Sequence, residues 1–370
     1  MRPLWIEVDL GALCNNFLAI KKFVGSSVKL VATVKQSAYG HGLIPVARKL
    51  SALGVDFLGV GSLEEAISLR KSGLKEPILI LTSVLKEFAG YFVSYNITPT
   101  VVDAGFAMAL NICAKKRHKR VKVHFKIDTG MGRLGPYYRD ARKLVNYIRK
   151  FSNIDLEGAY THFPAADTDI SFTNYQIGLF NKFIRILKND GVTFKYRHCA
   201  NSIGIINYPQ AHFNMVRPGI ILYGIKPSSL NLPVRPVLSL KSKITFLKKV
   251  KKGMSVSYAR SYISSKATRI ATVAVGYADG YPWSLSGRSR VIIKNKSYPL
   301  AGRVCMDHCM ADIGTRDNIK VGDEVILIGG EGKVSITAGE LAEKAGTIPY
   351  EIVSSLSQKI PRFYKESSKK

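Results

Sequence analysis

The chain lacks the long apolar runs and the regular cysteine spacings that mark membrane proteins and disulfide-rich secreted proteins. No stretch of its 370 residues approaches the roughly 18 uninterrupted apolar residues that cross a bilayer. The segment from Met1 to Asp9 has no basic flank, apolar run and small-residue cleavage site, so it is not typical of a signal peptide. The five cysteines are scattered without a repeated spacing, and we expect free thiols in a reducing cytoplasm.

Acidic residues are scarce as well. The 26 Asp and Glu stand against 55 Lys and Arg, which gives a formal net charge of +29, and a field of this sign attracts anions. The basic runs are Lys115–Arg120, Lys248–Lys252 and the tail Lys365–Lys370. No zinc-finger, RNP-like or recognition-helix pattern accompanies them. We therefore expect a basic surface without specific nucleic-acid binding, and a binder of anionic surfaces or nucleic acid that has lost catalysis is the alternative from another functional class.

Short β-rich runs alternate with helical patterns over the first two-thirds of the chain. The predicted strands are Val28–Val34, Asp56–Val60, Pro77–Leu81, Thr98–Val102, Val121–Ile127, Ile154–Tyr160, Phe194–His198 and Phe213–Val216. The predicted helices are Leu43–Leu53, Leu63–Lys71, Lys86–Ser94, Gly105–Lys116, Tyr137–Phe151 and Tyr175–Asn189, with a short connection around Ser202–Asn207. Eight such units in about 220 residues predict a (β/α)8 TIM barrel rather than a doubly wound sheet.

The segment Pro227–Pro236 interrupts this rhythm and predicts an interdomain linker. Beyond it the patterns are mostly β, with one predicted helix, in the order Leu238–Val250, Arg269–Val275, Arg290–Ile293, Glu324–Ile328 and the helix Thr337–Ala345. We therefore predict an α/β protein with a barrel over residues 1–230 and a β-rich C-terminal domain over residues 235–370. The first few residues are candidates to pack with the C-terminal domain.

Distinctive residues follow the predicted barrel strands at the ends where active sites lie in barrels of this kind. They are Lys35 after the first strand, Lys126 and Asp128 at the fifth, His162 after the sixth, Asn201 and Ser202 after the seventh, and Arg217, Gly219 and Ile220 after the eighth. Because they all lie at the same end of the predicted barrel, we expect them to form one active site.

Lys35 is the first candidate for catalysis. Desolvation and nearby cations lower the pKa of a lysine at a barrel mouth, which makes it a nucleophile able to form a Schiff base with an aldehyde. The alternative is a lysine that extends into solvent beside a loop. The segment from Ala32 to Gly42, Ala-Thr-Val-Lys-Gln-Ser-Ala-Tyr-Gly-His-Gly, resembles the lysine motif of alanine racemases, which usually has Ala-Asn where this chain has Gln36 and Ser37. The resemblance extends along nearly the whole chain.

This resemblance implies a pyridoxal 5'-phosphate enzyme that interconverts L- and D-alanine and supplies D-alanine for peptidoglycan. It implies that Lys35 holds the cofactor and is one of two racemising bases. It also implies that Tyr39, Ser202, Gly219 and Ile220 contact the cofactor phosphate, for which hydroxyls and backbone N–H groups with little bulk are suited. Ser202 is also expected to cap its helix.

Arg217 corresponds to an arginine that faces the cofactor's pyridine nitrogen. An arginine can only donate a hydrogen bond, so the nitrogen stays unprotonated and the cofactor is a weaker electron sink, which favours racemisation over transamination. His162 corresponds to a histidine that contacts this arginine. The alternatives are an arginine that bridges acidic residues and a histidine of the core.

The segment from Lys126 to Gly135 also matches the family. Arg133 corresponds to an arginine near the substrate carboxylate, and Lys126 to a lysine that is carbamylated in many members and holds the arginine in place. A buried pair of Lys126 and Asp128 is the alternative.

A racemase needs a second acid/base on the opposite face of the substrate, and the resemblance assigns this role to Tyr258. In the family this residue reaches the partner subunit's site, which implies a homodimer. Tyr277 corresponds to a residue of the entry path, and Met306 and Asp307 to residues beside the substrate. Ordinary strand aromatics are the alternative for Tyr258.

Two further features concern metals and specificity. Cys305, His308 and Cys309 lie within five residues of one another, but without a second cluster they are weak evidence for a metal site, and we expect none. Gln358 stands near the position where some members have a tyrosine that narrows the gate. Serine or broad-specificity racemisation is therefore the main alternative, and a barrel decarboxylase is disfavoured because such enzymes usually have an acidic residue where this chain has Arg217.

Overall fold

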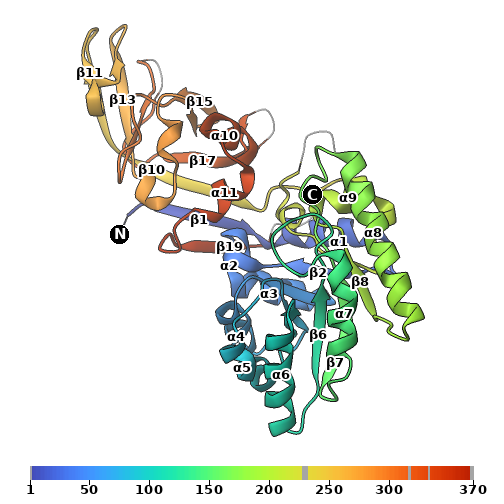
Figure 1. The fold of residues 1–370 in the computed structure, drawn as a ribbon. Helices are drawn as coiled ribbons and strands as arrows, with labels where there is room; N and C mark the ends of the chain where they lie inside the picture. The colour runs from blue at the N-terminus through green and yellow to red at the C-terminus, as the bar shows by residue number, and fades with distance from the viewer. Residues whose placement is uncertain (1, 227–231, 316–317, 332–333, 367–370) are drawn as a thin grey trace.

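The computed structural model describes residues 2–226, 232–315, 318–331 and 334–366, which form two domains (Figure 1). The first is a barrel of parallel strands, and the second is mostly β. The basic run Lys115–Arg120 and the lysines of Lys248–Lys252 are exposed. The linker expected at Pro227–Pro236 lies partly outside the described residues, as does the end of the basic tail Lys365–Lys370.

Eight parallel strands form the barrel in the described part of the chain. They are β2 (Lys29–Thr33), β3 (Phe57–Val60), β4 (Ile78–Ile80), β5 (Thr100–Val101), β6 (Val121–Lys126), β7 (Ile154–Tyr160), β8 (Tyr196–His198) and β9 (Met215–Val216). Each lies within a predicted strand. Backbone hydrogen bonds from Ile80 N–H to Thr98 O at 3.0 Å and from Arg217 N–H to Ala200 O at 3.0 Å join the two four-stranded halves.

Helices cover the outside of these strands (Figure 1). They are α3 (Leu43–Ala52), α4 (Leu63–Lys71), α5 (Ala89–Tyr95) after a 3-10 turn η1 (Lys86–Phe88), α6 (Ala104–Lys116), α7 (Tyr138–Ile148) and α8 (Ile170–Asn189), with short helices α9 (Ser202–Asn207), η2 (Pro209–Ala211) and η3 (Ile220–Tyr223) near the eighth strand. The predicted helix Tyr175–Asn189 begins too late, since Asp169 caps α8 by accepting a hydrogen bond from Phe172 N–H. No helix of the described residues has the length and apolarity needed to cross a membrane.

Helix α1 (Leu10–Val24) was not predicted. Asp9 caps it by accepting a hydrogen bond from Ala12 N–H. The buried Asn16 ties it to the end of the barrel, because its amide donates to Leu222 O at 2.9 Å and to Arg235 O at 2.8 Å. Since η3 is short, α1 packs at the place that a full eighth helix occupies in a regular barrel.

The second domain is built around the long strand β10 (Leu238–Val250), which leads away from the barrel (Figure 1). The chain's first strand, β1 (Leu4–Asp9), pairs antiparallel with β10 and parallel with β19 (Arg362–Lys365). The remaining elements are β11 (Ser255–Val256), β12 (Tyr262–Ile263), β13 (Thr268–Val273), β14 (Arg290–Ile293), β15 (Lys296–Pro299), β16 (Cys309–Asp312), β17 (Glu324–Glu331), β18 (Val334–Ile336), α10 (Ala338–Ala345) and α11 (Pro349–Ser354), with 3-10 turns η4 (Tyr258–Arg260), η5 (Tyr277–Asp279) and η6 (Trp283–Leu285).

The two domains meet beside the barrel mouth. A Cβ on Gly40 would lie 2.1 Å from the carbonyl oxygen of Val353, so only glycine allows α11 to pack this closely on the turn after Lys35. Nε of Arg362 donates to Gly40 O at 2.8 Å from the other side. These contacts fix the turn after Lys35 from outside the barrel.

Candidate active site

Lys35 lies at the barrel mouth, directly after β2 and at the start of the short helix α2 (Lys35–Tyr39). Burial lowers the pKa of its ammonium group from the usual value, and the positive charge of Arg133 lowers it further. The amine is therefore easier to deprotonate than that of an exposed lysine, as a nucleophile requires.

The residues after Lys35 form a left-handed turn. The φ angles of Gln36–Tyr39 lie between 53° and 54°, a region that side chains with a Cβ adopt only at a cost in energy. The carboxylate of Glu65 holds this turn, because it accepts hydrogen bonds from the backbone N–H groups of Ser37 and Gly61, both at 3.0 Å. A strained turn that is held from two sides gives Lys35 a defined direction.

Arg217 follows β9, with 5% of its surface exposed. Its Nη1 donates to the carbonyl oxygen of His198 at 3.0 Å and to Nδ1 of the same residue at 2.8 Å. Its Nη2 donates to the carbonyl oxygens of Thr161 and Cys199, each at 2.8 Å, and to Nδ1 of His162 at 3.2 Å. Its Nε–H is left without an acceptor among the described residues, and no described carboxylate forms an ion pair with the guanidinium.

Several positive charges converge on this mouth. Burial, together with the charges of Arg217 and Arg133, lowers the pKa of Lys126 to about 7. Burial and the same arginines hold the pKa of His162 well below its usual range, so its ring is neutral and accepts from Arg217. A mouth with so many cations suits an anionic phosphate and a substrate carboxylate.

The alternative of a buried pair between Lys126 and Asp128 is not found. The Oδ1 atom of Asp128 accepts hydrogen bonds from the backbone N–H groups of Gly130 and Met131, both at 2.8 Å. Nζ of Lys126 lies over the ring of Tyr160, 5.4 Å from its centroid. Within the described residues no ion pair joins Lys126 to Asp128, so its amine is not held by a carboxylate.

A second part of the mouth is suited to phosphate. Oγ of Ser202 accepts the N–H of Gly219 at 3.0 Å, and a Cβ on Gly219 would lie 2.7 Å from Oη of Tyr39 and 3.6 Å from Oγ of Ser202. Burial raises the pKa of Tyr39, so its hydroxyl stays protonated and can donate. Ile220 begins η3 beside them. Two hydroxyls and a backbone N–H therefore meet where no side chain takes up space.

The expectation that Ser202 also caps α9 is wrong by one residue. The cap is Asn201, whose Oδ1 accepts the N–H of Gly204 at 2.9 Å. Ser202 is the first helical residue, and its hydroxyl is directed at Gly219.

The other predicted residues lie on the C-terminal domain. Tyr258 stands in η4 with 68% of its surface exposed. Its neighbour Ser257 donates through Oγ to the carbonyl oxygen of Arg303 at 2.9 Å, which fixes η4 against the segment that leads to Met306.

The same segment brings the remaining residues together. The N–H of Tyr277 donates to Cys305 O at 3.0 Å, and the carboxylate of Asp307 lies 3.7 Å from Nη1 of Arg2. Tyr277 and Met306 are exposed. Among the described residues no hydrogen bond, ion pair or ring contact joins this cluster to Lys35 or Arg217, so a single chain holds two separate groups of candidate residues.

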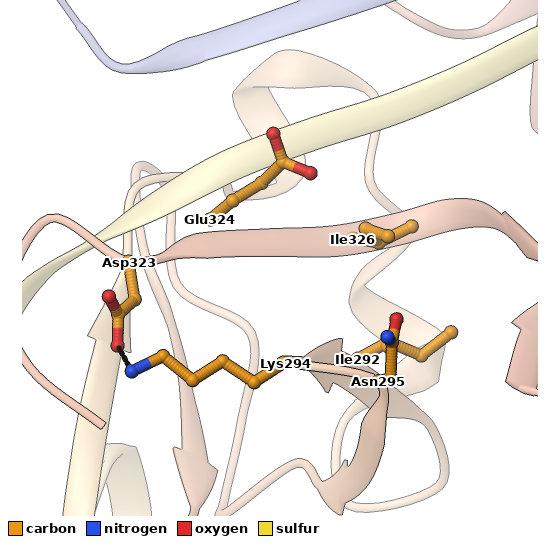
Figure 2. A pocket seen from close by; sticks show the side chains of 6 residues that line it. All are labelled: Ile292, Lys294, Asn295, Asp323, Glu324 and Ile326. Carbon is orange, nitrogen blue, oxygen red and sulfur yellow. Dashed lines mark ion pairs between the residues drawn. The ribbon is translucent and has the colours of Figure 1, made fainter. Parts of the chain in front are cut away.

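A hollow of about 210 Å³ lies apart from both groups, between β14 and β17. Figure 2 shows Lys294 extended toward Asp323, with Nζ and Oδ2 at 3.0 Å. None of the predicted site residues lines this hollow. No group of three or more His, Cys, Asp or Glu in the described residues could hold a metal ion. The five cysteines, Cys305 and Cys309 included, are unpaired.

Sequence analysis missed several side chains near these candidates, namely Glu65 on α4 and His124, Glu157, Tyr160 and His198 on the barrel strands. One signal in the sequence could have identified His124. Side chains alternate between the two faces of a strand, and His124 is two residues before Lys126 on β6, so the two share a face. Gln358, in contrast, is exposed, and its backbone carbonyl accepts from Arg362 at 3.5 Å.

Comparison with known proteins gives a consistent result. Two family models match, "Alanine racemase, N-terminal domain" over residues 8–227 and "Alanine racemase, C-terminal domain" over residues 237–364. The alanine racemase of Halothermothrix orenii is 43% identical over 368 residues, covering 98% of this chain and 97% of that protein. The alanine racemase structure of Clostridium difficile 630 is similar with a TM-score of 0.93 and 37% identity, covering 99% of this chain and 96% of that one.

The candidate phosphate site formed by Tyr39, Ser202 and Gly219 leads to a testable prediction. Gly219→Ala places a Cβ where it displaces the Tyr39 hydroxyl. The loss of one hydrogen bond to a charged group weakens pyridoxal 5'-phosphate binding about tenfold or more, as measured by absorbance after equilibrium dialysis. Gly178→Ala is the control, because a Cβ there meets no atom within 4 Å. Equal cofactor affinity of the two variants would contradict the assignment of a phosphate site at Gly219.

Proposed function

The chain belongs to the alanine racemase family, and from this we propose that Lys35 of one subunit and Tyr258 of its partner are the two acid/base groups of its active site. As a member of this family the protein is a pyridoxal-phosphate-dependent isomerase that interconverts L- and D-alanine. Supply of D-alanine for peptidoglycan is the general role of the family.

The buried guanidinium of Arg217 is the observation that carries the assignment of residues. Four of its N–H groups are taken up by carbonyl oxygens and imidazoles, which leaves Nε–H for a ligand in the mouth that contains Lys35. A ring nitrogen with a free lone pair fits this donor. The hydroxyls of Tyr39 and Ser202, beside Gly219 with its missing side chain, fit a phosphate, and the amine of Lys35 fits an aldehyde, so the described residues match all three ends of the cofactor.

When bound, the cofactor supplies an electron-withdrawing ring that acidifies the α-proton of the amino acid. The protein then has to hold the ring nitrogen unprotonated, bind the substrate carboxylate and move a proton on either face. Arg217 does the first, because a guanidinium has no proton to give up and no lone pair to offer. Arg133 at the cationic mouth is suited to the second.

Two bases are needed for the third task, since a single base returns the proton to the face that it came from. Lys35 serves one face through Nζ. Tyr258 is exposed on the other domain, without a contact to Lys35 of its own chain among the described residues. We therefore propose that its hydroxyl serves a partner subunit's site in a homodimer, together with Tyr277, Met306 and Asp307 of the same cluster.

The substrate preference and the compartment are also proposals. We propose alanine as the preferred substrate and serine as the main competitor, because the exposed Gln358 leaves the gate less restricted than a tyrosine would. The unpaired cysteines favour the reducing cytoplasm.

Incubation of the holoenzyme with L-alanine, L-serine and L-lysine, followed by chiral chromatography, tests the substrate assignment. We expect D-alanine as the dominant product and D-serine at a lower kcat/KM. Faster formation of D-serine or D-lysine would contradict the proposed preference for alanine, and release of carbon dioxide would indicate the decarboxylase alternative.

Arg217→Glu tests the role of the guanidinium. A carboxylic acid at this position shares a proton with the ring nitrogen and strengthens electron withdrawal, so racemisation falls and pyruvate formation rises relative to it by roughly tenfold or more. The matched control is Arg117→Glu, the same charge change at an exposed position. An unchanged ratio of pyruvate to D-alanine in Arg217→Glu would refute the role proposed for Arg217.

Lys126 is predicted to be carbamylated. Its pKa of about 7 leaves much of the amine neutral near pH 7, and the neutral amine is the form that reacts with carbon dioxide. The resulting anion offsets the charge of Arg133. With carbon-13-labelled bicarbonate, NMR should show a carbamate signal that grows from pH 6 to pH 8 and is absent in Lys126→Gln. A plain ammonium at Lys126 throughout this range contradicts the prediction.

Mixing of two inactive variants tests the shared site. Lys35→Ala and Tyr258→Phe homodimers should each be nearly inactive. In a mixed dimer one site collects both lesions and the other has neither, so random exchange of subunits restores about one-quarter of wild-type activity. If both residues act within one chain, activity stays low even when native mass spectrometry shows the mixed dimer.

A further inference from the structure

A row of buried polar side chains leads from Arg217 into the barrel interior. Nδ1 of His198 lies 2.8 Å from Nη1 of Arg217, and Nε2 of His198 lies 2.9 Å from Nδ1 of His124. Nε2 of His124 lies 3.7 Å from Oε2 of Glu157, whose other oxygen is 3.0 Å from Nζ of Lys122. Both imidazoles have no exposed surface, and 6% of the Glu157 side chain is exposed.

The two ends of this row set the direction of its two hydrogen bonds, which join Arg217 to His198 and His198 to His124. Arg217 can only donate, so Nδ1 of His198 must accept. Burial lowers the pKa of both imidazoles, so each is neutral and has one N–H group. The proton of His198 is then on Nε2 and is donated to Nδ1 of His124, and the proton of His124 is on Nε2 and faces Glu157. Burial raises the pKa of Glu157, but the contact with His124 and the charge of Lys122 outweigh it and hold the pKa below the usual value, so an ionised carboxylate faces this N–H across 3.7 Å, an electrostatic contact longer than a hydrogen bond.

The backbone is arranged to allow this row. Strands β6, β7 and β8 lie side by side (Figure 1). Along β6 and β7, Val123 pairs with Leu156 and His124 pairs with Gly158, so Glu157 is an extra residue in a β-bulge. A bulge changes the face on which a side chain projects, and it brings Glu157 to His124.

Gly158 is a second, independent constraint. A Cβ at this position would lie 2.7 Å from three atoms of the His124 ring, so the ring occupies the space of the missing side chain. His198 is held in turn by Tyr160, on which it stacks with ring centroids 4.6 Å apart and an angle of 8° between the planes.

We propose that His124 and Glu157 are positioning residues that fix the tautomer of His198 and thereby hold Arg217 in the orientation needed for racemisation. The inference deepens the proposed function and rests on the role given there to Arg217. No carboxylate of the described residues contacts the guanidinium of Arg217. Glu157 is connected to it only indirectly, through His124 and His198.

The row predicts what happens when the carboxylate is replaced. In Glu157→Gln the amide can donate as well as accept. If it donates to Nε2 of His124, the proton of His124 moves to Nδ1 and faces the N–H of His198. His198 then has to carry its proton on Nδ1, against the N–H of Arg217, and the guanidinium is pushed out of place.

Two-bond proton–nitrogen NMR of histidine-labelled protein, with and without cofactor, tests the row directly in the wild type. We expect neutral imidazoles with the proton on Nε2 for both His124 and His198 at pH 7. A proton on Nδ1 of either residue, or a doubly protonated ring, overturns the proposal whether or not any variant folds.

Kinetics of Glu157→Gln test its consequence. We expect kcat to fall about tenfold, the loss that follows from weakening one charge-assisted hydrogen bond, with KM for alanine unchanged because the carboxylate contact is untouched. The His124 signals should change as well. Asp56→Asn is the matched control, because Asp56 also pairs with a lysine, Lys29, at 2.8 Å and accepts a backbone N–H. Wild-type kcat and tautomers in Glu157→Gln, or an equal loss of kcat in Asp56→Asn, would contradict the proposal.

The NMR measurement on cofactor-free protein separates this proposal from the function on which it rests. If the tautomers are as expected but Arg217→Glu leaves the product ratio unchanged, the role of Arg217 fails and the row stands. If the product ratio responds to Arg217→Glu but a tautomer is reversed, the row fails and the role of Arg217 stands.

Discussion

A permanently charged guanidinium is buried at the barrel mouth without a carboxylate in contact with it. Removing such a charge from water is costly unless hydrogen bonds satisfy it. At Arg217 the compensation comes from three backbone carbonyl oxygens and two neutral imidazoles. This arrangement uses the ends of β7 and β8 at once, since Thr161 follows one strand and His198 ends the other. The register of β7 and β8 therefore also determines the direction of the Arg217 Nε–H group, which points into the barrel mouth.

The rest of the mouth follows from the same positive charge. Burial lowers the pKa of Lys126 and of His162, and this charge lowers it further, so that one amine is more easily deprotonated and one imidazole is an acceptor. An anionic cofactor and a carboxylate substrate then enter a region that is short of negative charge, which is consistent with a chain that has few acidic residues overall. Tyr258, the proposed second proton carrier, lies on another domain. The proposed dimer supplies it from outside, and the barrel needs no further residue at its crowded mouth.

The barrel could be predicted because its strands are short apolar runs and its helices have clear periodicity, and every observed barrel strand lies within a predicted one. Elements with weaker signals were missed. Helix α1 begins at Leu10, directly after the strand β1 of the other domain, and α11 is short. Candidate residues of the site could be found where they follow a strand, and the structure places Lys35 and Arg217 after β2 and β9. Glu157 could not be found in this way, because a bulge reverses the face expected from strand alternation, and the choice between Asn201 and Ser202 as a helix cap depends on a single residue of offset.

The central claim is that the buried guanidinium keeps the cofactor's ring nitrogen unprotonated. The most direct test is nitrogen-15 NMR of the holoenzyme reconstituted with pyridoxal 5'-phosphate labelled at the ring nitrogen. The account predicts the chemical shift of an unprotonated pyridine that accepts a hydrogen bond, with no directly bound proton between pH 6 and pH 9. A pyridinium shift with one-bond coupling to a proton would contradict it.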